Sequence, residues 1–259
     1  MFDLVQKTLT CPTCKRSIIK SHAKNCIAKN KITKVDGIWD FVSSSKEKSQ
    51  VNNEDKHSKG SWHRIDDGSY EILAAIARGN KAIDIACGDG YIEELAPQTV
   101  GVDYSISALK KAKQNGAKYL VCARAENLPF ATNSFDIAIC AGSIENIENP
   151  QKAILEMARV SKMQIMTVHR EFSFPLARLV RSLISFFFNI ENQAVEKPLK
   201  WQELEKYLKK AKLHIVFKGL WTLPVNYGKV VSFLPVFKSI PSCFFVITIK
   251  DPKNAQNQI

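Results

Sequence analysis

From residue 70 onward, apolar segments typical of buried strands alternate with segments whose apolar positions recur at helical spacing. This alternation predicts an α/β domain with a doubly wound, largely parallel sheet, in which ligands bind at the carboxyl ends of the strands. Two strands close the chain after the last helix, whereas a plain dinucleotide-binding sheet more often ends on parallel units. Helices are predicted at residues 70–77, 90–96, 107–114, 150–161 and 200–211, and seven strands at 82–86, 99–103, 118–123, 135–141, 164–169, 213–219 and 243–250.

A polar stretch separates this domain from the N-terminal part of the chain. Residues 42–60, VSSSKEKSQVNNEDKHSKG, have almost no apolar anchors and are predicted to form a flexible linker. Residues 1–41 then form a small cysteine-bearing unit that ends in the apolar segment VDGIWDF, and residues 61–259 form the main domain. The strand and helix alternation breaks at an insert, about residues 171–198.

The net charge of +12 is concentrated at the two ends of the chain. Residues 1–60 hold 12 Lys and Arg against 6 Asp and Glu, and residues 196–259 hold 11 against 4. Such a distribution suits a polyanion such as RNA, or an anionic membrane surface. Solvated lysines that only favour solubility are the alternative explanation.

The chain shows no pattern of export or membrane insertion. Its longest apolar stretch, LVRSLISFFFNI, is interrupted by Arg181 and is shorter than a membrane span. The N-terminus has no apolar core of signal-peptide length, so a cytoplasmic protein is expected, with peripheral membrane contact as an option. Seven cysteines, of which only Cys11 and Cys14 are closely spaced, favour reduced thiols and one metal site over a disulfide framework.

The segment KAIDIACGDGYIEELA, residues 81–96, joins a buried strand directly to a helix. Gly88 and Gly90 permit a sharp turn and let a ligand lie against main-chain amides. Taken alone, this turn leaves open a nicotinamide or flavin enzyme, or a tight bend without a ligand. Glu93 stands where a dinucleotide fold has its third small residue, which argues against the nicotinamide interpretation.

Together with VGVDYS and ARAENLPFATNSFDIAICAGSIENIENP, this segment resembles the class I S-adenosylmethionine-dependent methyltransferases, specifically the type 11 subgroup, over roughly residues 65–170. The resemblance implies a Rossmann-like seven-stranded sheet and S-adenosylmethionine as the cofactor. One residue departs from the family: Arg124 stands where an acidic residue is usual, which keeps a non-catalytic binding protein with a decayed cofactor site as an alternative. The cofactor-binding residues implied by the resemblance are Asp84, Cys87, Gly88 and Gly90 for the methionine part, Asp103 for the ribose, Ala125 and Glu126 for the adenine, and Tyr104 and Cys140 beside them.

The N-terminal segment CPTCKRSIIKSHAKNCIAKNKITKVDGIWDF resembles the zinc-ribbon segment found ahead of some methyltransferases, including rRNA guanine-N1 enzymes. Lys29 stands where the fourth thiolate of that pattern is expected, and an ammonium group is not a zinc ligand. Imidazole nitrogen is an ordinary partner for thiolates in a closed zinc site, so His22 is expected to replace it. The predicted metal ligands are Cys11, Cys14, Cys26 and His22, and the alternative is a metal-free apolar cluster.

Methyl transfer mainly requires an aligned nucleophile and exclusion of water, so catalytic residues are difficult to name from sequence. His169, at the end of the fifth strand, is the leading candidate for a general base or a substrate-orienting group, followed by Asn146 and Glu171. A small or lipid-like acceptor is favoured by the aromatic insert, in which Phe186 to Phe188 either wall the acceptor pocket or enter a membrane surface. RNA is the alternative acceptor, favoured by the basic ends.

Overall fold

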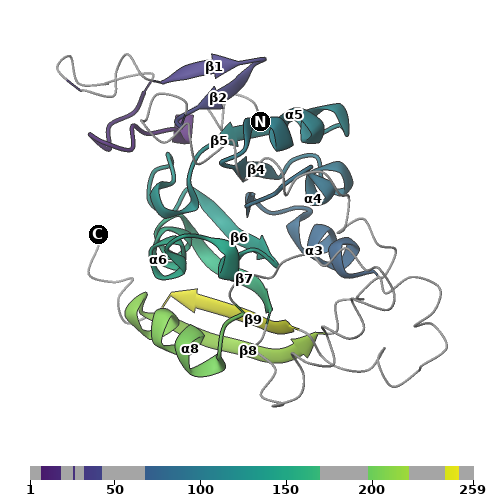
Figure 1. Ribbon diagram of the computed structural model, residues 1–259, viewed down its shortest axis with the longest axis vertical. Coiled ribbons are helices and arrows are strands. Elements are labelled where there is room, and N and C mark those ends of the chain that lie inside the picture. The colour runs from purple at the N-terminus through teal and green to yellow at the C-terminus, as the bar shows by residue number, and fades with distance from the viewer. Residues whose placement is uncertain are drawn as a thin grey trace, which may run out of the picture.

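The computed structural model describes residues 7–18, 26, 32–42, 68–169, 198–221 and 243–250. Its centre is a nine-stranded sheet in the order β1-β2-β5-β4-β3-β6-β7-β9-β8 (Figure 1). The strands are β1 (Thr33–Val35), β2 (Ile38–Asp40), β3 (Ala82–Ile85), β4 (Val100–Asp103), β5 (Tyr119–Cys122), β6 (Phe135–Ala141), β7 (Ser161–His169), β8 (Leu213–Trp221) and β9 (Cys243–Lys250). The helices are α3 (Ser69–Ala77), α4 (Tyr91–Leu95), α5 (Ile106–Gln114), α6 (Pro150–Val160) and α8 (Trp201–Lys210), with short 3-10 turns η2 (Ala125–Asn127) and η3 (Ile144–Asn146).

The seven predicted strands are all present, as β3 to β9. Strands β5, β4, β3, β6 and β7 are parallel to their neighbours, and β9 runs antiparallel between β7 and β8. The α/β prediction is therefore confirmed. Because β3 and β4 are parallel neighbours, their carboxyl ends meet at one edge of the sheet, which is where the glycine turn was expected to bind a ligand.

The sheet has two strands more than the seven predicted. Strands β1 and β2 form a hairpin through Asp36 (φ 51°) and Gly37 (φ 83°), and β2 pairs in parallel with β5, with Asp40 opposite Cys122. Two consecutive residues with positive φ are the geometry of a tight hairpin turn. The hairpin covers what would otherwise be an exposed edge of β5, so part of the N-terminal segment belongs to the main sheet.

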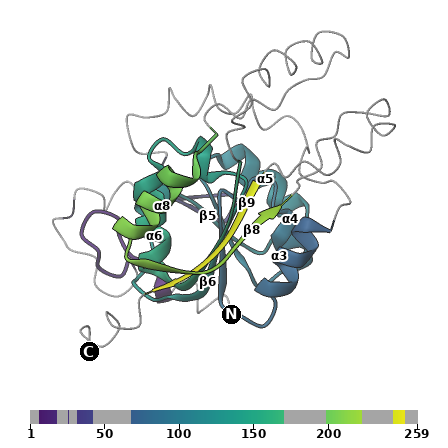
Figure 2. The same cartoon turned by 90° about the horizontal axis from the view of Figure 1, so that it is seen from below.

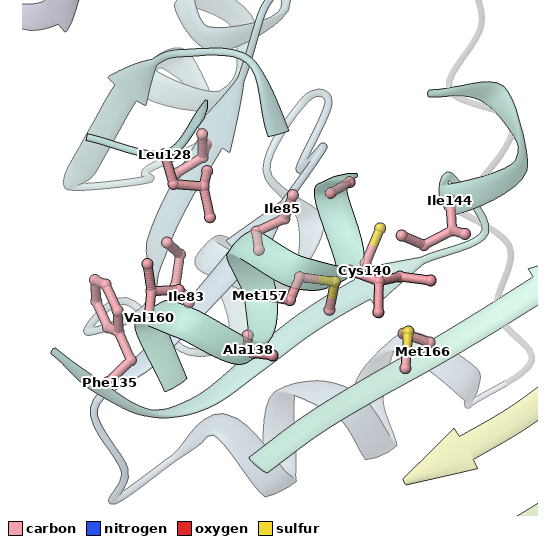
Figure 3. Packing of buried hydrophobic residues seen from close by; sticks show 14 of the residues in the cluster. Ile83, Ile85, Leu128, Phe135, Ala138, Cys140, Ile144, Met157, Val160 and Met166 are labelled. Carbon is pink, nitrogen blue, oxygen red and sulfur yellow. The ribbon is translucent and has the colours of Figure 1, made fainter. Parts of the chain in front are cut away.

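Helices cover both faces of the sheet (Figure 2). On one face α3 packs through Leu73, Ala74 and Ala77, while α5 packs through Leu109 and Ala112. On the other face, α6 and α8 contribute to the largest apolar cluster, part of which is shown in Figure 3. In the part of the chain that the structure describes, no helix is both long enough and apolar enough to cross a membrane.

Side-chain caps mark the start of two helices. The Ser105 hydroxyl accepts the backbone N–H of Ala108 at the start of α5, and the Asn149 side chain accepts that of Lys152 at the start of α6. Such caps satisfy main-chain donors that have no partner within a helix. Both helices follow the carboxyl end of a strand or its loop, so the caps also fix the loops that border the candidate site.

Candidate functional site

The turn after β3 has the tight geometry that its glycines predict. Ala86, Gly88 and Gly90 all have positive φ, at 61°, 57° and 79°. A Cβ atom at Gly90 would lie only 2.7 Å from the Cβ of Ala112 on α5. Gly90 is therefore required both by its backbone conformation and by the close approach of α4 to α5.

Asp103 holds this turn from the end of the neighbouring strand. Its Oδ2 accepts the backbone N–H of Gly88 at 3.0 Å, and its Oδ1 accepts that of Ser105 at 2.8 Å. A carboxylate has about four acceptor positions, and the resemblance implies that Asp103 also accepts hydrogen bonds from the ribose hydroxyls. Asp103 and Gly88 are thus brought together as predicted, while the ribose contact stays a prediction.

Two further carboxylates are buried beneath the turn. Asp84 on β3 is 3% exposed and Glu93 on α4 is 0% exposed. Among the described residues, Oδ1 of Asp84 and both carboxylate oxygens of Glu93 have no hydrogen-bond partner. Burial, and then the charge of the neighbouring acid, raises the pKa of each: Asp103 acts on Asp84, and Asp84 acts on Glu93.

This arrangement fits a cationic ligand. S-adenosylmethionine carries an ammonium and a sulfonium group, and the unpaired oxygen of Asp84 is a suitable acceptor for the ammonium. Sequence reasoning named Asp84 but not Glu93 as part of the site. A charged residue on a helix is usually solvent-exposed, so no sequence signal indicated that Glu93 points inward.

Cys87 and Cys140, the two cysteines among the predicted cofactor-binding residues, are both buried. Burial and nearby carboxylates raise the pKa of both Cys87 and Cys140, which keeps them protonated. Cys140 lies within the main apolar cluster (Figure 3) and is 0% exposed, so its side chain packs in the core and not on the surface of the crevice. Cys87 is also buried, and it packs with α5.

Arg124, the departure from the family pattern, is held by acidic residues at the end of β5. It forms ion pairs with Glu126 at 3.4 Å and with Glu148. Glu126 in turn accepts the backbone N–H of Asn149 at 3.3 Å, which links η2 to the start of α6. Ala125 and Glu126, the predicted adenine neighbours, therefore lie at the same edge of the sheet as Asp103, which pairs with Cys122 across β4 and β5.

His169 is joined to a carboxylate that sequence reasoning missed. Its Nδ1 contacts the Glu145 carboxylate, which also accepts the His169 backbone N–H at 3.2 Å. Burial by itself lowers the pKa of His169, but hydrogen bonds to the Cys243 side chain and to Glu145 raise it to about 10. Asn146, the other predicted catalytic residue, is exposed beside them, whereas Glu171 lies outside the described residues.

Three of the four predicted metal ligands come together. The sulfur atoms of Cys11, Cys14 and Cys26 all lie within 4.8 Å of one another. The Cys11 and Cys26 sulfurs are 3.6 Å apart, close to the spacing of about 3.8 Å that a tetrahedral site with zinc–sulfur bonds of about 2.3 Å requires. The backbone N–H of Cys14 also points to the Cys11 sulfur, at 3.5 Å. His22 lies outside the described residues.

Comparison with known proteins agrees with this geometry. A family model described as "Methyltransferase domain" matches residues 83–164, from β3 to the start of β7. The segment from β3 to the start of β7 is therefore similar to a methyltransferase domain. The match covers the glycine turn, Asp103 and η2, so the parts that resemble a cofactor site belong to the methyltransferase domain itself.

Two curated relatives carry this domain. The demethylmenaquinone methyltransferase of Paenarthrobacter aurescens is 34% identical over 127 residues, which cover 47% of this chain and 49% of the relative. The ubiquinone/menaquinone biosynthesis C-methyltransferase of Geobacter sulfurreducens is 34% identical over 126 residues, covering 43% and 49%. This chain therefore spans about half the length of the curated relatives that it matches.

Solved structures show the same fold at low identity. A magnesium protoporphyrin IX methyltransferase from Synechocystis PCC 6803 has a TM-score of 0.53 and 14% identity, covering 79% of this chain and 96% of that one. A methyltransferase from Thermotoga maritima has a TM-score of 0.52 and 15% identity, covering 80% and 97%. These likenesses support the methyltransferase fold and carry no information about the acceptor.

Proposed function

We propose that this chain transfers a methyl group from S-adenosylmethionine to a small, apolar acceptor of the quinone type. The observation that carries the proposal is the hydrogen bond from Gly88 to Asp103, which joins the glycine turn and a ribose-type carboxylate at the carboxyl ends of β3 and β4. The names of the curated relatives, demethylmenaquinone and ubiquinone/menaquinone methyltransferases, support the choice of acceptor class.

In this proposal, Asp84 and Asp103 hold the ammonium and the ribose of the cofactor, and the turn at Ala125 and Glu126 borders its adenine. When bound, the cofactor supplies a methyl group on a sulfonium that is ready to leave. The chain has to orient the acceptor against that methyl group and exclude water from the crevice.

The base role expected for His169 is not favoured by its contacts. With a pKa of about 10, His169 carries a positive charge at neutral pH and has no lone pair with which to take a proton. Its ring is also engaged by Glu145 and Cys243. We therefore assign His169 to positioning the segment around η3, and we assign contact with the acceptor to the exposed Asn146.

The test is a transfer assay with cofactor labelled at the methyl group. Reduced demethylmenaquinone in detergent, total tRNA and a protein extract are offered separately. Label that enters the organic phase supports the proposal, whereas label in RNA establishes the alternative acceptor that the basic ends favour. Absence of S-adenosylhomocysteine binding in a calorimeter would leave only the non-catalytic alternative.

A lipid-like acceptor also requires access to a membrane, so we propose peripheral binding to anionic lipid. Strand β8, at the end of the sheet, exposes Val216, Phe217 and Leu220 to solvent by 50% or more, and exposed Lys212 and Lys218 lie on or next to the same strand. Phe217 and Lys218 are consecutive residues of the strand and point to opposite faces, so contact with an anionic membrane would occur along the exposed edge of β8.

Liposome flotation tests this proposal. Wild type should float with anionic vesicles at low salt, a Phe217→Ser variant should float less, and an Ile72→Ser control, which changes an exposed residue on α3, should behave as wild type. Wild type that stays with the soluble fraction would rule out membrane contact. The segment of residues 173–190, the other candidate for such contact, lies outside the described residues.

We also propose that Cys11, Cys14 and Cys26 hold one structural zinc ion, with His22, which lies outside the described residues, as the fourth ligand. The knuckle geometry at Cys11 and Cys14 supports it, because a main-chain N–H directed at a cysteine sulfur stabilises the thiolate form that binds metal. Elemental analysis of protein purified under reducing conditions should give about one zinc per chain. A stoichiometry near zero in metal-supplemented cultures would contradict the proposal.

A further inference from the structure

The N-terminal unit, meaning residues 7–18, 26 and 32–42, contacts both sides of the segment predicted to bind adenine. That segment, the adenosine turn, comprises residues 124–127 and follows β5. On one side the unit contributes the hairpin of β1 and β2, and on the other it contributes the cysteine knuckle. Neither contact was expected from a sequence in which a polar linker separates the two parts.

The hairpin fixes the start of the adenosine turn. Strand β2 runs parallel to β5, so both strands end at the edge where Asp103 lies. The backbone N–H of Phe41 donates to the carbonyl of Cys122 at 2.9 Å, and that of Ala123 donates to the carbonyl of Asp103 at 3.0 Å. Main-chain bonds thus run from the N-terminal unit through the end of β5 to the predicted ribose carboxylate.

The buried side chain of Asp40 lies next to the contact between the hairpin and β5. Asp40, at the end of β2, is 0% exposed and lies opposite Cys122 in the sheet. The Cys122 thiol donates to the carbonyl of Tyr104 at 3.4 Å, on the residue that follows Asp103. Burial and then the charge of Asp40 raise the pKa of Cys122, so the thiol keeps the proton that this hydrogen bond needs.

Residues 8–15, which include the cysteine knuckle at Cys11 and Cys14, contact the end of the adenosine turn and the residues that follow it. Thr10 donates its backbone N–H to the carbonyl of Pro129 at 2.9 Å, and Ala131 donates to the carbonyl of Thr8 at 2.9 Å. Leu9, between these bonds, is 0% exposed and belongs to the main apolar cluster. Lys15, inside the knuckle, donates to the side chain of Asn127 at 3.0 Å.

From these contacts we infer that metal binding at Cys11, Cys14 and Cys26 and cofactor binding at the adenosine turn strengthen each other. A metal ion that joins the knuckle to Cys26 would restrict residues 11–15, which include Lys15, the partner of Asn127, and it would anchor the chain next to Thr10, the partner of Pro129. A turn that is already ordered loses less conformational entropy when a ligand binds. The inference rests on the proposed function, because it takes the adenosine turn to be part of a cofactor site.

Thermodynamic linkage makes the inference testable in two directions. If metal raises the affinity for the cofactor by some factor, the cofactor must raise the affinity for metal by the same factor. We expect a factor of about 5 or more, at the lower end of typical couplings. The probes are S-adenosylhomocysteine and Zn²⁺, each titrated calorimetrically into full-length protein in the presence and absence of the other.

The inference is supported if Zn²⁺ raises the affinity for S-adenosylhomocysteine, and S-adenosylhomocysteine raises the affinity for Zn²⁺, by the same factor of more than about five. Identical affinities for S-adenosylhomocysteine in the zinc-loaded and zinc-free protein, both shown by circular dichroism to be folded, would overturn it. Failure of both forms to bind S-adenosylhomocysteine would instead contradict the proposed function. Hydrogen exchange gives a readout without the cofactor: zinc should slow exchange of the amides of residues 125–131, and unchanged exchange there would also overturn the inference.

If the zinc-free protein does not stay folded, the inference is tested with the variant Lys15→Met instead. This variant keeps the three thiols but removes the contact with Asn127, so zinc binding should be retained and S-adenosylhomocysteine should bind several-fold more weakly. Lys118→Met is the matched control, because Lys118 is also an exposed lysine and lies at the opposite end of β5. Equal affinities in the two variants would overturn the inference.

Discussion

The backbone N–H of Gly88 and the carboxylate of Asp103 are 3.0 Å apart, so one side chain ties the turn after β3 to the end of β4. Asp103 also accepts the N–H of Ser105, which caps α5. A residue expected from the sequence only to contact the ribose therefore also organises the backbone around it. Substitution of Asp103 should affect both cofactor binding and stability.

Replacement of Asp103 with Asn tests this dual role. Asn keeps one acceptor oxygen but loses the charge, so we expect S-adenosylhomocysteine binding to weaken by about 1.5–3 kcal/mol, with a smaller loss of folding stability. Calorimetry and urea denaturation measure the two effects. Asp136→Asn is the control, because Asp136 also accepts a backbone N–H and pairs with a lysine, but at the start of β6. Unchanged affinity in Asp103→Asn would show that Asp103 does not meet the ribose.

The close approach of α4 to α5 makes a second prediction, with a matched pair of glycines. Gly79 and Gly90 share a φ of 79°, but a Cβ atom at Gly79 would meet nothing within 4 Å, whereas at Gly90 it would lie 2.7 Å from Ala112. Gly79→Ala should cost about 1 kcal/mol for its backbone conformation. Gly90→Ala should cost about 1–3 kcal/mol more, because it also overpacks the helix contact. If urea denaturation shows the same loss of unfolding free energy in both variants, α4 can move away from α5 without destabilising the fold.

The features that could be predicted from the sequence are those set by residues close together in the chain. The seven strands, the glycine turn and Asp103 depend on local apolar runs and on residues at strand ends, and these could be predicted. Strands β1 and β2 have three residues each, too few to show a period, so neither their hairpin nor the pairing of β2 with β5 could be read from the pattern.

The missed site residues depend on tertiary contacts. Glu145 and His169 are 24 residues apart, and only the parallel pairing of β6 with β7 brings them together. Glu93 lies on a helix of five residues, where an inward-facing position cannot be distinguished from an outward-facing one. Arg124 was recognised as unusual, but its ion pairs with Glu126 and Glu148 became visible only in the fold.

The pairing of His169 with Glu145 predicts a pH dependence of stability. The pKa of His169 is about 10 in the folded chain and 6.5 for the free side chain, so the folded state binds the proton more tightly. The resulting stabilisation is fully present below pH 6.5 and is lost as the pH rises toward 10. The difference in unfolding free energy between wild type and His169→Asn should therefore shrink between pH 6.5 and pH 10.

Chemical denaturation at several pH values measures this difference. His214→Asn is the control, because His214 is exposed on β8 and its replacement should give a small difference at every pH. A wild-type advantage over His169→Asn that is the same at pH 6 and pH 10 would show that the ion pair with Glu145 does not stabilise the fold. Loss of methyl transfer without loss of stability would return His169 to a catalytic role.

For Glu93 we expect the opposite effect of substitution on stability, because burial of its carboxyl group is unfavourable. Both of its carboxylate oxygens are buried without a partner among the described residues, and burial together with the charge of Asp84 raises its pKa. The folded state therefore retains a proton that the unfolded chain releases above a pH of about 4.5, and this side chain contributes less stability as the pH rises. Glu93→Gln puts a neutral amide of similar size in place of this ionisable group, so the cost of keeping the proton is removed.

We expect Glu93→Gln to raise the unfolding free energy at pH 7.5 by about 1–3 kcal/mol, with a smaller gain near pH 4.5. Glu94→Gln, at the exposed neighbouring position on α4, should change little at either pH. Thermal and urea denaturation of the three proteins measure the gains. A Glu93→Gln variant that is less stable than wild type at both pH values would contradict the prediction, and it would mean that the Glu93 carboxylate is stabilised by a positive group or by water. If the variant is more stable but binds S-adenosylhomocysteine more weakly, the unfavourable burial of Glu93 is retained because its carboxyl group contributes to cofactor binding.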